Sequence, residues 1–439
     1  MSEITVGIDI GSTSVKAVAA DGDGHVVARA RVRHPLLAPA ADRLEHDANK
    51  AWRLGPRRAL KALAVDDVKA VSVVAMVPSF TAVDRRGMPG TPGLIYGDGR
   101  GRRPDVGTEA EGFLAWTAAE SPGARGYWPA QAVANHSLSG EVVLDTSAAA
   151  SSSPVFSLEQ WGWDAELLAR HGARPDQLPR VAGMGEAVGR VRDLGDAVLD
   201  CGGVDAVGEQ IVAGAGNEGD VLVLLGTTLI VWAVTAAPPA DTPFVSFPHM
   251  GAPGMNFVGG PSNAGGLFLG WVDGWLGRPR GKGPDAADPR HIPVWAPFPR
   301  GERDPYEDHE RRGMLADLDL THGAAAVRRA ALEASCFVAR RFIEASKVPA
   351  RRIVATGGGV RMPGWTQALA DCTGLPVDVV AVPEGAALGA AFMARMAAGL
   401  ETSMDGAARW ARTAERVEAD PAWAGPTAAR YDRFLEVAG

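Results

Sequence analysis

The chain has 439 residues, which is long enough for two or three domains at about 100–200 residues each. Hydrophobic residues make up 46% and charged residues 22%, a composition that is typical of a globular protein and excludes a disordered one. The formal net charge of −8 at pH 7 argues against a dedicated nucleic-acid-binding protein, because such proteins normally carry a basic surface.

The first half of the chain opens with a predicted three-stranded antiparallel meander. Its β-branched strands cover residues 4–10, 15–20 and 26–32, with glycine-rich turns at 11–14 and 21–24. Further along, the pattern predicts strands over 68–74, 81–83 and 94–96, and helices over 50–63 (disturbed at Gly55-Pro56), 109–119, 159–171 and 206–213. These elements belong to an α/β fold.

The opening pattern returns about half a chain later. Strands are predicted over 221–225 and 229–234, again with a glycine-and-hydroxyl turn between them. The repeat predicts two similar domains with a boundary near residues 210–220. The rest of the second half reads as helices over 324–346, 365–372 and 384–398 and strands over 352–356 and 377–382.

The uncharged run 221–240 is long enough to raise the question of a membrane span. Its central Gly-Thr-Thr and its β-branched halves predict two buried strands instead. The three cysteines, Cys201, Cys336 and Cys372, lack the spacing of a zinc ribbon or a redox dithiol and suit a reducing compartment. No signal peptide precedes the first strand, so we expect a cytoplasmic location.

The two hairpin turns are candidate phosphate-binding sites. Free backbone N–H groups and hydroxyl donors suit phosphate oxygens, although ordinary hairpins use the same residues. Asp9 directly precedes the first turn, where its carboxylate could hold Mg²⁺, and Lys16 follows on the returning strand. The candidate residues are Gly11, Ser12, Thr13, Ser14, Gly226, Thr227 and Thr228. A Walker A loop is absent from the sequence.

Three other segments have both a structural and a functional interpretation. The run Gly357-Gly358-Gly359 either makes a tight turn or lets a base or ribose lie against the backbone. Asp205, at a predicted helix start, is either an N-cap or a carboxylate that takes a proton from an alcohol. Asp98 is either a turn residue or a ligand for a polyol. The nine histidines form no ligand pair by spacing, and the acidic segment 304–310 is interpreted as a solvated loop.

Taken together, the motifs resemble those of the FGGY carbohydrate kinases, and within that family they look most like those of the xylulokinases. The similarity covers roughly residues 4–435 and keeps the family's order. Its six motifs begin at Gly7 (Gly-Ile-Asp-Ile-Gly-Ser-Thr-Ser-Val-Lys), Gly203 (Gly-Val-Asp-Ala-Val-Gly), Leu225 (Leu-Gly-Thr-Thr), Gly301 (Gly-Glu-Arg-Asp-Pro), Thr356 (Thr-Gly-Gly-Gly) and Glu384.

This resemblance implies two actin-like, ribonuclease-H-like domains with a cleft between them. Residues 1–215 would be the sugar-binding domain and residues 216–439 the nucleotide-binding domain. Family members transfer the γ-phosphoryl group of MgATP to a hydroxyl of a sugar or polyol. The resemblance makes Asp205 the general base, places Mg²⁺ at Asp9, and assigns phosphates to the two turns with Lys16. Gly357, Gly358 and Gly359 would line the adenosine site.

The acceptor site departs from the xylulokinase pattern in two places. Met76-Val77-Pro78-Ser79 stands where xylulokinases have Gln-Met-His-Gly, and Tyr96-Gly97-Asp98-Gly99-Arg100 stands where they have Trp-Asn-Asp-Gly-Arg. The substrate-binding residues that the resemblance implies are Val77, Pro78, Tyr96, Asp98, Arg100 and Asp205. ATP chemistry is expected to be kept, and D-xylulose is expected to be a poor acceptor.

Two other functions remain open from the sequence. One is an ATP-binding conformational protein of the actin and heat-shock ATPase group, and the other is a catalytically degenerate sugar sensor. The position of Asp205 between glycines argues against an ATP-binding conformational protein. The presence of both Asp9 and Asp205 argues against a degenerate sugar sensor. We expect a small sugar or polyol as the partner, with no nucleic acid and no membrane, and a homodimer is left open.

Overall fold

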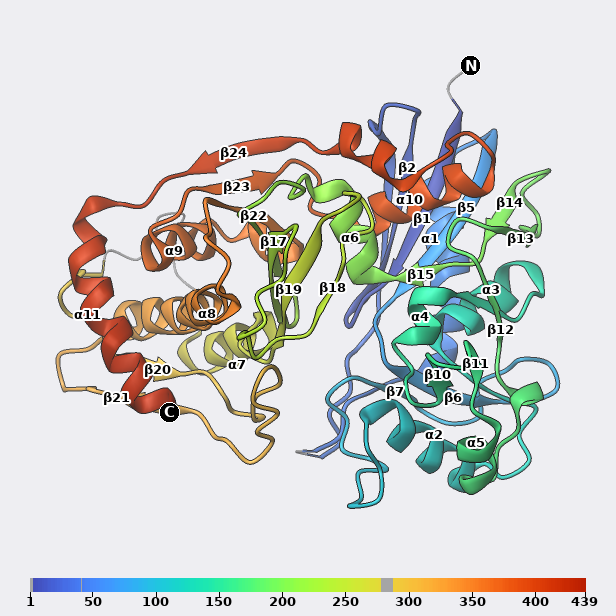
Figure 1. The fold of residues 1–439 in the computed structure, drawn as a ribbon, viewed down its shortest axis with the longest axis horizontal. Helices are drawn as coiled ribbons and strands as arrows, with labels where there is room; N and C mark the ends of the chain where they lie inside the picture. The colour runs from blue at the N-terminus through green and yellow to red at the C-terminus, as the bar shows by residue number, and fades with distance from the viewer. Residues whose placement is uncertain (1–2, 41, 278–286) are drawn as a thin grey trace. The chain divides into compact units, whose positions relative to one another are not determined.

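The computed structural model describes residues 3–40, 42–277 and 287–439, and the chain divides into two compact units (Figure 1). The first unit comprises Met1–Val212 and Glu384–Trp410, and the second comprises Ala213–Pro383 and Ala411–Gly439. The first boundary falls close to the expected residue 215. The expected continuous second domain is interrupted, however, because Glu384–Trp410 packs with the first unit.

The first unit is built on a seven-stranded sheet. The strands follow the order β13-β14-β5-β1-β2-β3, and β15 also pairs with β5, next to β14. The antiparallel β1-β2-β3 meander is as predicted, and β5 joins β1 in parallel. The bounds are β1 (Ile4–Ile10), β2 (Ser14–Ala20), β3 (Val26–Arg33), β5 (Val68–Ala75), β13 (Ala187–Arg190), β14 (Val198–Asp200) and β15 (Gly203–Val204).

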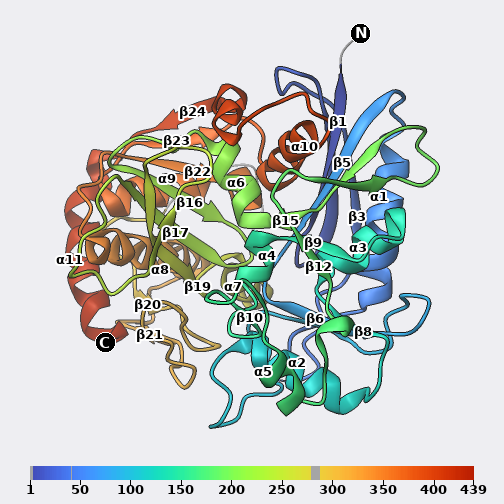
Figure 2. The same ribbon diagram turned by 45° about the vertical axis from the view of Figure 1, so that its right-hand side comes forward.

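Strand β1 presents different chemistry to the two faces of this sheet. Val6, Ile8 and Ile10 enter a hydrophobic core with the helix α1 (Gly55–Leu63). Because side chains alternate along a strand, Thr5, Gly7 and Asp9 share the opposite face. Helix α10 (Gly385–Ala397) covers that face, as the view in Figure 2 shows, and the Thr5 hydroxyl donates to the Ala391 carbonyl at 2.8 Å.

Helix α10 approaches its neighbours at glycine positions. A Cβ added to Gly7 would lie 1.8 Å from the Ala387 carbonyl oxygen, and one added to Gly389 would lie 2.0 Å from the Gly208 carbonyl oxygen. Gly208 belongs to helix α6 (Asp205–Ala213). Backbone therefore packs directly on backbone between β1, α10 and α6, and no side chain larger than hydrogen fits at these contacts.

The remaining elements of the first unit form smaller layers. A four-stranded sheet has the order β4-β7-β6-β8, and two strand pairs flank it. The strands are β4 (Glu45–His46), β6 (Ser79–Val83), β7 (Gly93–Ile95), β8 (Gly126–Trp128), β9 (Val143–Asp145), β10 (Phe156–Ser157), β11 (Gly162–Trp163) and β12 (Arg180–Ala182). The helices are η1 (Asn49–Leu54), α2 (Glu109–Glu120), α3 (Ala130–Ser139), α4 (Thr146–Ala150), α5 (Ala165–Arg170), η2 (Pro175–Gln177) and η4 (Met404–Trp410).

The second unit repeats the topology of the first. Its sheet has the order β18-β19-β17-β16-β22-β23-β24, in which β16, β17 and β19 are antiparallel and β22 joins β16 in parallel. The strands are β16 (Asp220–Leu225), β17 (Leu229–Thr235), β18 (Ser246–Pro248), β19 (Asn256–Ser262), β22 (Arg352–Thr356), β23 (Val377–Val380) and β24 (Thr413–Val417), with β20 (Val294–Ala296) and β21 (Met314–Ala316) as a separate pair. The helices are α7 (Gly266–Leu276), α8 (Ala324–Ser346), η3 (Gly358–Arg361), α9 (Pro363–Thr373) and α11 (Pro421–Ala438).

Two sequence expectations have clear outcomes. The run 221–240 contains β16 and β17, and no helix within residues 3–40, 42–277 and 287–439 combines the length and apolar composition that a membrane crossing requires. The helix predicted over 159–171 is wrong at its start. Trp161 adopts a positive φ of 52° in the β10–β11 turn, and the helix begins only after Asp164, whose carboxylate accepts from the Leu167 N–H at 2.9 Å.

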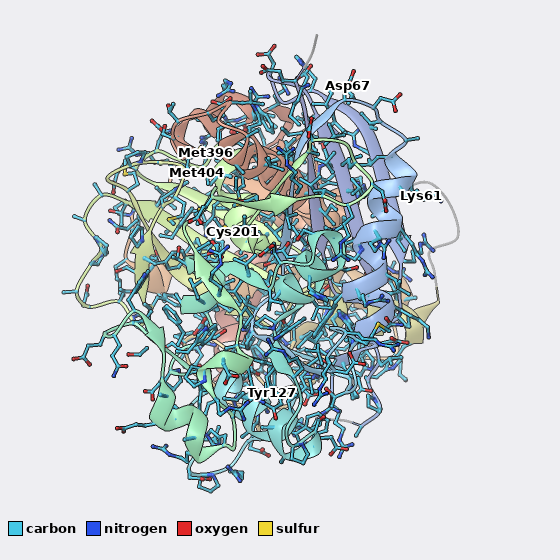
Figure 3. All side chains as sticks on the ribbon, turned by 90° about the vertical axis from the view of Figure 1, so that its right-hand side faces the viewer. Lys61, Asp67, Tyr127, Cys201, Met396 and Met404 are labelled. Atoms are coloured by element: carbon cyan, nitrogen blue, oxygen red, sulfur yellow. The ribbon has the colours of Figure 1, made fainter. Side chains whose placement is uncertain are left out.

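All three cysteines are free and buried, which agrees with the expectation of small apolar residues. Cys201, labelled in Figure 3, lies directly after β14 in the first unit. Burial and the nearby Asp200 raise the pKa of its thiol well above the ordinary range, so the group stays protonated at neutral pH.

The close backbone contacts predict opposite effects for two helical glycines. Gly389→Ala in α10 should lower the free energy of unfolding by about 1–3 kcal/mol, because the new methyl group overlaps the Gly208 backbone. Gly270→Ala in α7, where nothing lies within 4 Å of an added Cβ, should raise it by up to about 1 kcal/mol through helix propensity. Chemical denaturation of both variants measures the difference, and equal effects would contradict the packing argument.

Candidate functional site

Asp9 and Lys16 form an ion pair on the face of the sheet that α10 covers. The two residues are direct partners in the β1–β2 ladder, so the register alone places their side chains side by side. The Lys16 Nζ donates to the Asp9 Oδ2 at 2.9 Å. This carboxylate raises the pKa of Lys16, against the opposing effect of burial, so Lys16 carries its positive charge at neutral pH.

Asp205 reaches the same end of the sheet from the other side of β5. Val74 of β5 pairs with Asp9 of β1 on one side and with Gly203 of β15 on the other. Asp205 follows β15 directly and is the first residue of α6, with its Oδ1 accepting from the Ala206 N–H at 2.7 Å. An N-cap residue precedes the first helical residue, and its side chain accepts a hydrogen bond from an N–H two or three residues further along. Asp205 does neither, so it does not fit the N-cap interpretation.

The surroundings of Asp205 favour a carboxyl group that exchanges its proton near neutral pH. Burial, followed by the negative charge of Asp9, raises the pKa of Asp205 to about 7. The Ala206 N–H and the Lys16 ammonium act in the opposite direction. Part of Asp205 still reaches solvent, so a bound molecule could contact the carboxyl group.

Two neighbouring carboxyl groups show the same kind of pKa shift without access to solvent. Burial raises the pKa of Asp145 to about 6 and that of Asp200 to about 7. Both side chains are fully buried and accept hydrogen bonds from serine hydroxyls at 2.6 Å, Asp145 from Ser147 and Asp200 from Ser72. Neither group can touch a ligand as placed, so accessibility singles out Asp205 among the three.

The first glycine-and-hydroxyl turn is a tight connection between β1 and β2. The Gly11 N–H donates to the Ser14 carbonyl at 3.1 Å, and Thr13 is exposed while Ser12 and Ser14 are buried. The Ser12 hydroxyl lies 2.7 Å from the Tyr96 hydroxyl. The turn and one of the expected substrate-binding residues are therefore in direct contact.

A buried histidine, which no motif in the sequence predicts, holds the backbone of this turn by a hydrogen bond. The Trp52 Nε1–H donates to the His46 Nδ1 at 2.9 Å. Because the indole nitrogen is only a donor, the His46 Nδ1 must be the acceptor, and its Nε2–H then donates to the Ser12 carbonyl at 2.8 Å. Burial lowers the pKa of His46 to about 4, so the ring is neutral and this tautomer is the one present at neutral pH.

The expected substrate-binding residues divide into two groups. Val77 and Pro78 follow β5 and are half-buried. Asp98 is fully buried, and its carboxylate accepts from the Arg100 Nε at 3.0 Å and Nη2 at 2.7 Å and from the Leu44 N–H at 2.6 Å. Arg100 also pairs with Glu45 at 2.6 Å. Asp98 therefore holds Arg100 in place, and its oxygens are already occupied.

The second turn, in the other unit, is fixed by the start of a helix. The Gly226 N–H donates to the Thr228 carbonyl at 3.1 Å. From the start of α7, the N–H groups of Gly266 and Leu267 donate to the Gly226 and Thr227 carbonyls at 2.8 and 3.0 Å. The backbone of the turn is thus held rigid, while Thr227 and Thr228 remain half-buried.

The triple glycine lies beside this second turn. Leu224 of β16 pairs with Thr356 of β22, so Gly226 and Gly357 leave the same end of adjacent parallel strands. Gly357 has a φ of 88° and lies close to the Leu225 backbone, and a Cβ on Gly359 would lie 2.4 Å from the Trp365 ring. Gly358 is exposed, with open space where a side chain would stand. A flat surface of backbone results.

The structure thus brings the candidate residues together within each unit. Asp9, Lys16 and Asp205 meet in the first unit, where Ser12 meets Tyr96, and the Gly226 turn meets Gly357 in the second. The sequence analysis missed His46 and Trp52. Their spacing of six residues carries no ligand-like pattern, and only the fold brings both against the Ser12 backbone.

The comparisons with known proteins agree with one another. Residues 4–102 match the N-terminal domain, and residues 221–398 the C-terminal domain, of the FGGY family of carbohydrate kinases. A gluconokinase of Bacillus subtilis is 25% identical over 92% of this chain and 90% of its own, and a xylulose kinase of Streptomyces coelicolor is 28% identical over 93% and 90%. The crystal structure of a xylulose kinase from Rhodospirillum rubrum aligns with a TM-score of 0.76 at 25% identity, over 99% of this chain and 98% of that one.

The hydrogen bonds of His46 predict a difference between two substitutions. His46→Leu leaves the Ser12 carbonyl and the Trp52 N–H unpaired, so it should lower the free energy of unfolding by about 2 kcal/mol or more. It should also speed hydrogen exchange at residues 11–14. His46→Gln offers an amide oxygen to Trp52 and an amide N–H to Ser12, so exchange should stay near wild type. Equal exchange in the two variants would show that His46 does not brace the turn.

Proposed function

Because the chain belongs to the FGGY family of carbohydrate kinases, it phosphorylates a sugar or polyol with ATP, and we propose how its own residues divide that work. The observation that carries the proposal is the meeting of Asp205 with the Asp9–Lys16 pair at one end of the sheet, with a pKa for Asp205 of about 7. Phosphoryl transfer needs mainly positioning and charge stabilisation, together with one base that orients the acceptor.

Asp205 is the proposed general base. In its ionised form the carboxylate accepts the proton of the acceptor hydroxyl as that oxygen attacks the γ-phosphorus, and ADP leaves. A base is most effective when its pKa lies near the working pH, because it is then ionised and still basic. The raised pKa of Asp205 meets this condition, whereas an ordinary exposed aspartate would be a much weaker base.

Asp9 is the proposed ligand of Mg²⁺, directly or through water. A carboxylate oxygen is the kind of ligand that this hard cation prefers, and Lys16 already holds the Asp9 Oδ2 in a fixed position. Bound Mg²⁺ would neutralise charge on the phosphate oxygens. Lys16 itself brings a positive charge to the same place, which supports a role beside the phosphates.

The two turns are the proposed phosphate-binding elements, and the triple glycine is the proposed adenosine-binding surface. The hydroxyls of Ser12, Thr13 and Ser14 and of Thr227 and Thr228 supply side-chain donors next to backbone N–H groups. Both turns have rigid backbones, which lowers the entropy cost of binding. Gly358 leaves room for a flat base above the backbone.

The acceptor is proposed to bind near Asp205 against Val77, Pro78, Tyr96 and Arg100. Arg100 presents a guanidinium that Asp98 and Glu45 hold in place, so Asp98 acts as a positioning residue. The wall at Val77 and Pro78 is apolar, and Pro78 lacks a backbone N–H, whereas the neighbouring Met76 is buried in the core and lines no part of the wall. A substrate with an apolar or deoxy face suits this wall better than one that is hydroxylated throughout.

The base assignment predicts the behaviour of Asp205→Asn. The amide keeps the shape but accepts no proton, so kcat should fall by about 10²–10⁴-fold while ATP binding is nearly unchanged. In the wild type, kcat/KM should rise with pH through about 7 as Asp205 ionises, and the variant should lack this limb. Rates within a few-fold of wild type would show that Asp205 is not the base.

A second readout of the same variant does not depend on turnover. The pKa of Asp205 is higher in the folded chain than in the unfolded one, so folding binds a proton and stability falls as pH rises from about 4 to above 7. Asp205→Asn should therefore unfold at a higher temperature than wild type at pH 8, and the difference should shrink towards pH 4. If Asp205→Asn instead unfolds at a lower temperature than wild type at pH 8, the ionised Asp205 does not destabilise the folded chain and the prediction is wrong.

The apolar wall predicts the acceptor preference. In an ADP-release screen over C3–C7 ketoses, polyols and aldonates, D-xylulose should give a kcat/KM below about 10⁴ M⁻¹s⁻¹, because hydroxyls facing Val77 and Pro78 would lose their hydrogen bonds to water without replacement. Another member of the screen should exceed it. Efficient turnover of D-xylulose would restore an ordinary xylulose kinase assignment.

A further inference from the structure

Three potential metal ligands meet in the second unit, in a part of it that the proposed reaction does not use. They are His291, Asp319 and His322. Strands β20 and β21 pair antiparallel with Val294 opposite Ala316. If this register is extended by three residues beyond Val294 and Ala316, His291 lies opposite Asp319. His322 follows Asp319 by three residues, in the turn that leads into α8.

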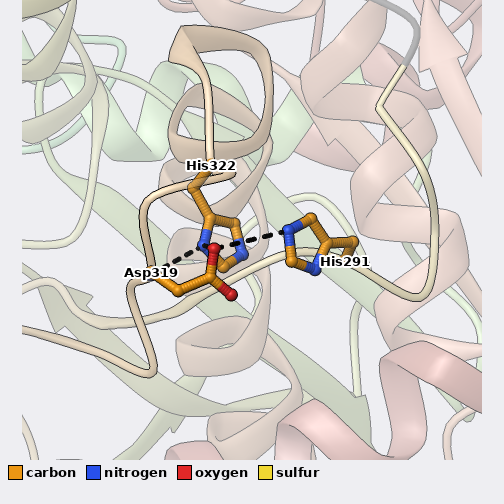
Figure 4. Close-up of side chains that lie close together, drawn as sticks. All are labelled: His291, Asp319 and His322. Atoms are coloured by element: carbon orange, nitrogen blue, oxygen red, sulfur yellow. Dashed lines mark hydrogen bonds and ion pairs between the residues drawn. The ribbon is translucent and has the colours of Figure 1, made fainter.

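The three side chains present one ligand atom each to a common space. These atoms all lie within 4.8 Å of one another. The Asp319 Oδ1 is 3.3 Å from the His322 Nδ1 and 3.8 Å from the His291 Nε2, as the dashed lines in Figure 4 mark. The two imidazole rings stack with centroids 4.0 Å apart. Neighbouring ligand atoms around a tetrahedral zinc ion are about 3.3–3.5 Å apart, which is close to the spacing found here. A metal ion lies in the plane of each imidazole ring that binds it, so the exposed ring of His291 must turn out of the stack to bind.

We propose that His291, Asp319 and His322 bind a divalent transition-metal ion. Two imidazoles and one carboxylate suit Zn²⁺ and its first-row neighbours rather than Mg²⁺, which takes oxygen ligands. The site goes beyond the proposed function, because none of the three residues belongs to the proposed base, phosphate or acceptor sites. Water would complete the coordination, since Asp319 is exposed and His291 is half-buried.

The hydrogen bonds around the three residues show what the ion replaces. The Thr321 hydroxyl and N–H both donate to the Asp319 Oδ1, at 2.6 and 2.8 Å, and so hold the carboxylate in place. The His291 Nε2 is 2.5 Å from the Thr321 Oγ1, and the Asp319 N–H donates to the His322 Nδ1 at 2.9 Å. A metal ion bound here would replace the Thr321 hydroxyl as the partner of the His291 Nε2 and the Asp319 N–H as the partner of the His322 Nδ1.

Binding would fasten the turn before α8 to the segment that enters β20. The side chain of His322 is only 4% exposed, so its ring is already held by the fold, whereas those of His291 and Asp319 are 43% and 55% exposed. The ion would therefore hold the exposed side chains of His291 and Asp319 against the buried ring of His322. An ion that binds the folded chain and not the unfolded one raises the unfolding temperature.

The test uses untagged, nucleotide-free full-length chain and Zn²⁺ alone. Titration calorimetry at pH 7.5 should find one Zn²⁺ per chain with a dissociation constant at or below about 10 µM. His291→Ala and His322→Ala should each weaken binding at least about 10-fold and abolish the rise in unfolding temperature that Zn²⁺ gives the wild type. Co²⁺ as a second probe should give visible absorption from a nitrogen-containing site, lost in both variants.

Two controls separate this site from others on the chain. His25→Ala removes an exposed histidine that also lies beside an aspartate, Asp21, but stands outside the His291, Asp319 and His322 cluster, and the variant should bind Zn²⁺ like wild type. Asp9→Ala removes the proposed Mg²⁺ ligand and should leave the Zn²⁺ affinity unchanged. Wild type that binds no Zn²⁺ at 100 µM, or histidine variants that bind as wild type does, would overturn the proposal, whatever the kinase assays show.

Discussion

The backbone contact between β1, α10 and α6 is the constraint on which the proposed site depends. Gly7, Gly208 and Gly389 let three elements meet without side chains between them. Asp205 lies one helical turn before Gly208, so the contact that fixes Gly208 also fixes the direction in which α6 starts. The position of Asp205 relative to Asp9 is therefore set by van der Waals packing of backbone atoms, which yields little to strain.

The electrostatics of the first unit follow from that packing. Asp9, Asp205 and Lys16 are held together, with Lys16 bound to Asp9 rather than to Asp205. Burial and the charge of Asp9 raise the pKa of Asp205, and Lys16 opposes them only in part. A lysine shared equally between the two acids would lower both pKa values and weaken the base. The ladder register, which pairs Lys16 with Asp9, thus sets the chemistry of Asp205.

The sequence was sufficient wherever short-range pattern decides the structure. The residue pattern within 4–10, 15–20 and 221–234 is enough to predict strands, and the structure has antiparallel strand pairs at both places. The sequence was insufficient where contacts between residues far apart in the chain determine the local structure. A helix over 159–171 is favoured by composition, but the backbone at Trp161 turns the other way before Asp164 caps the helix. His291 and His322 lie in separate segments, one before β20 and one in the turn before α8, and the fold brings them together.

The return of Glu384–Trp410 to the first unit has a consequence for biosynthesis. The chain passes between the two units after residues 212, 383 and 410, so the face of the first sheet that bears Thr5, Gly7 and Asp9 receives its covering helix only from a late segment. While the ribosome is still making the second unit, that face lacks the helix that covers it in the finished fold. The first unit can therefore complete its fold only after Glu384–Trp410 has been synthesised.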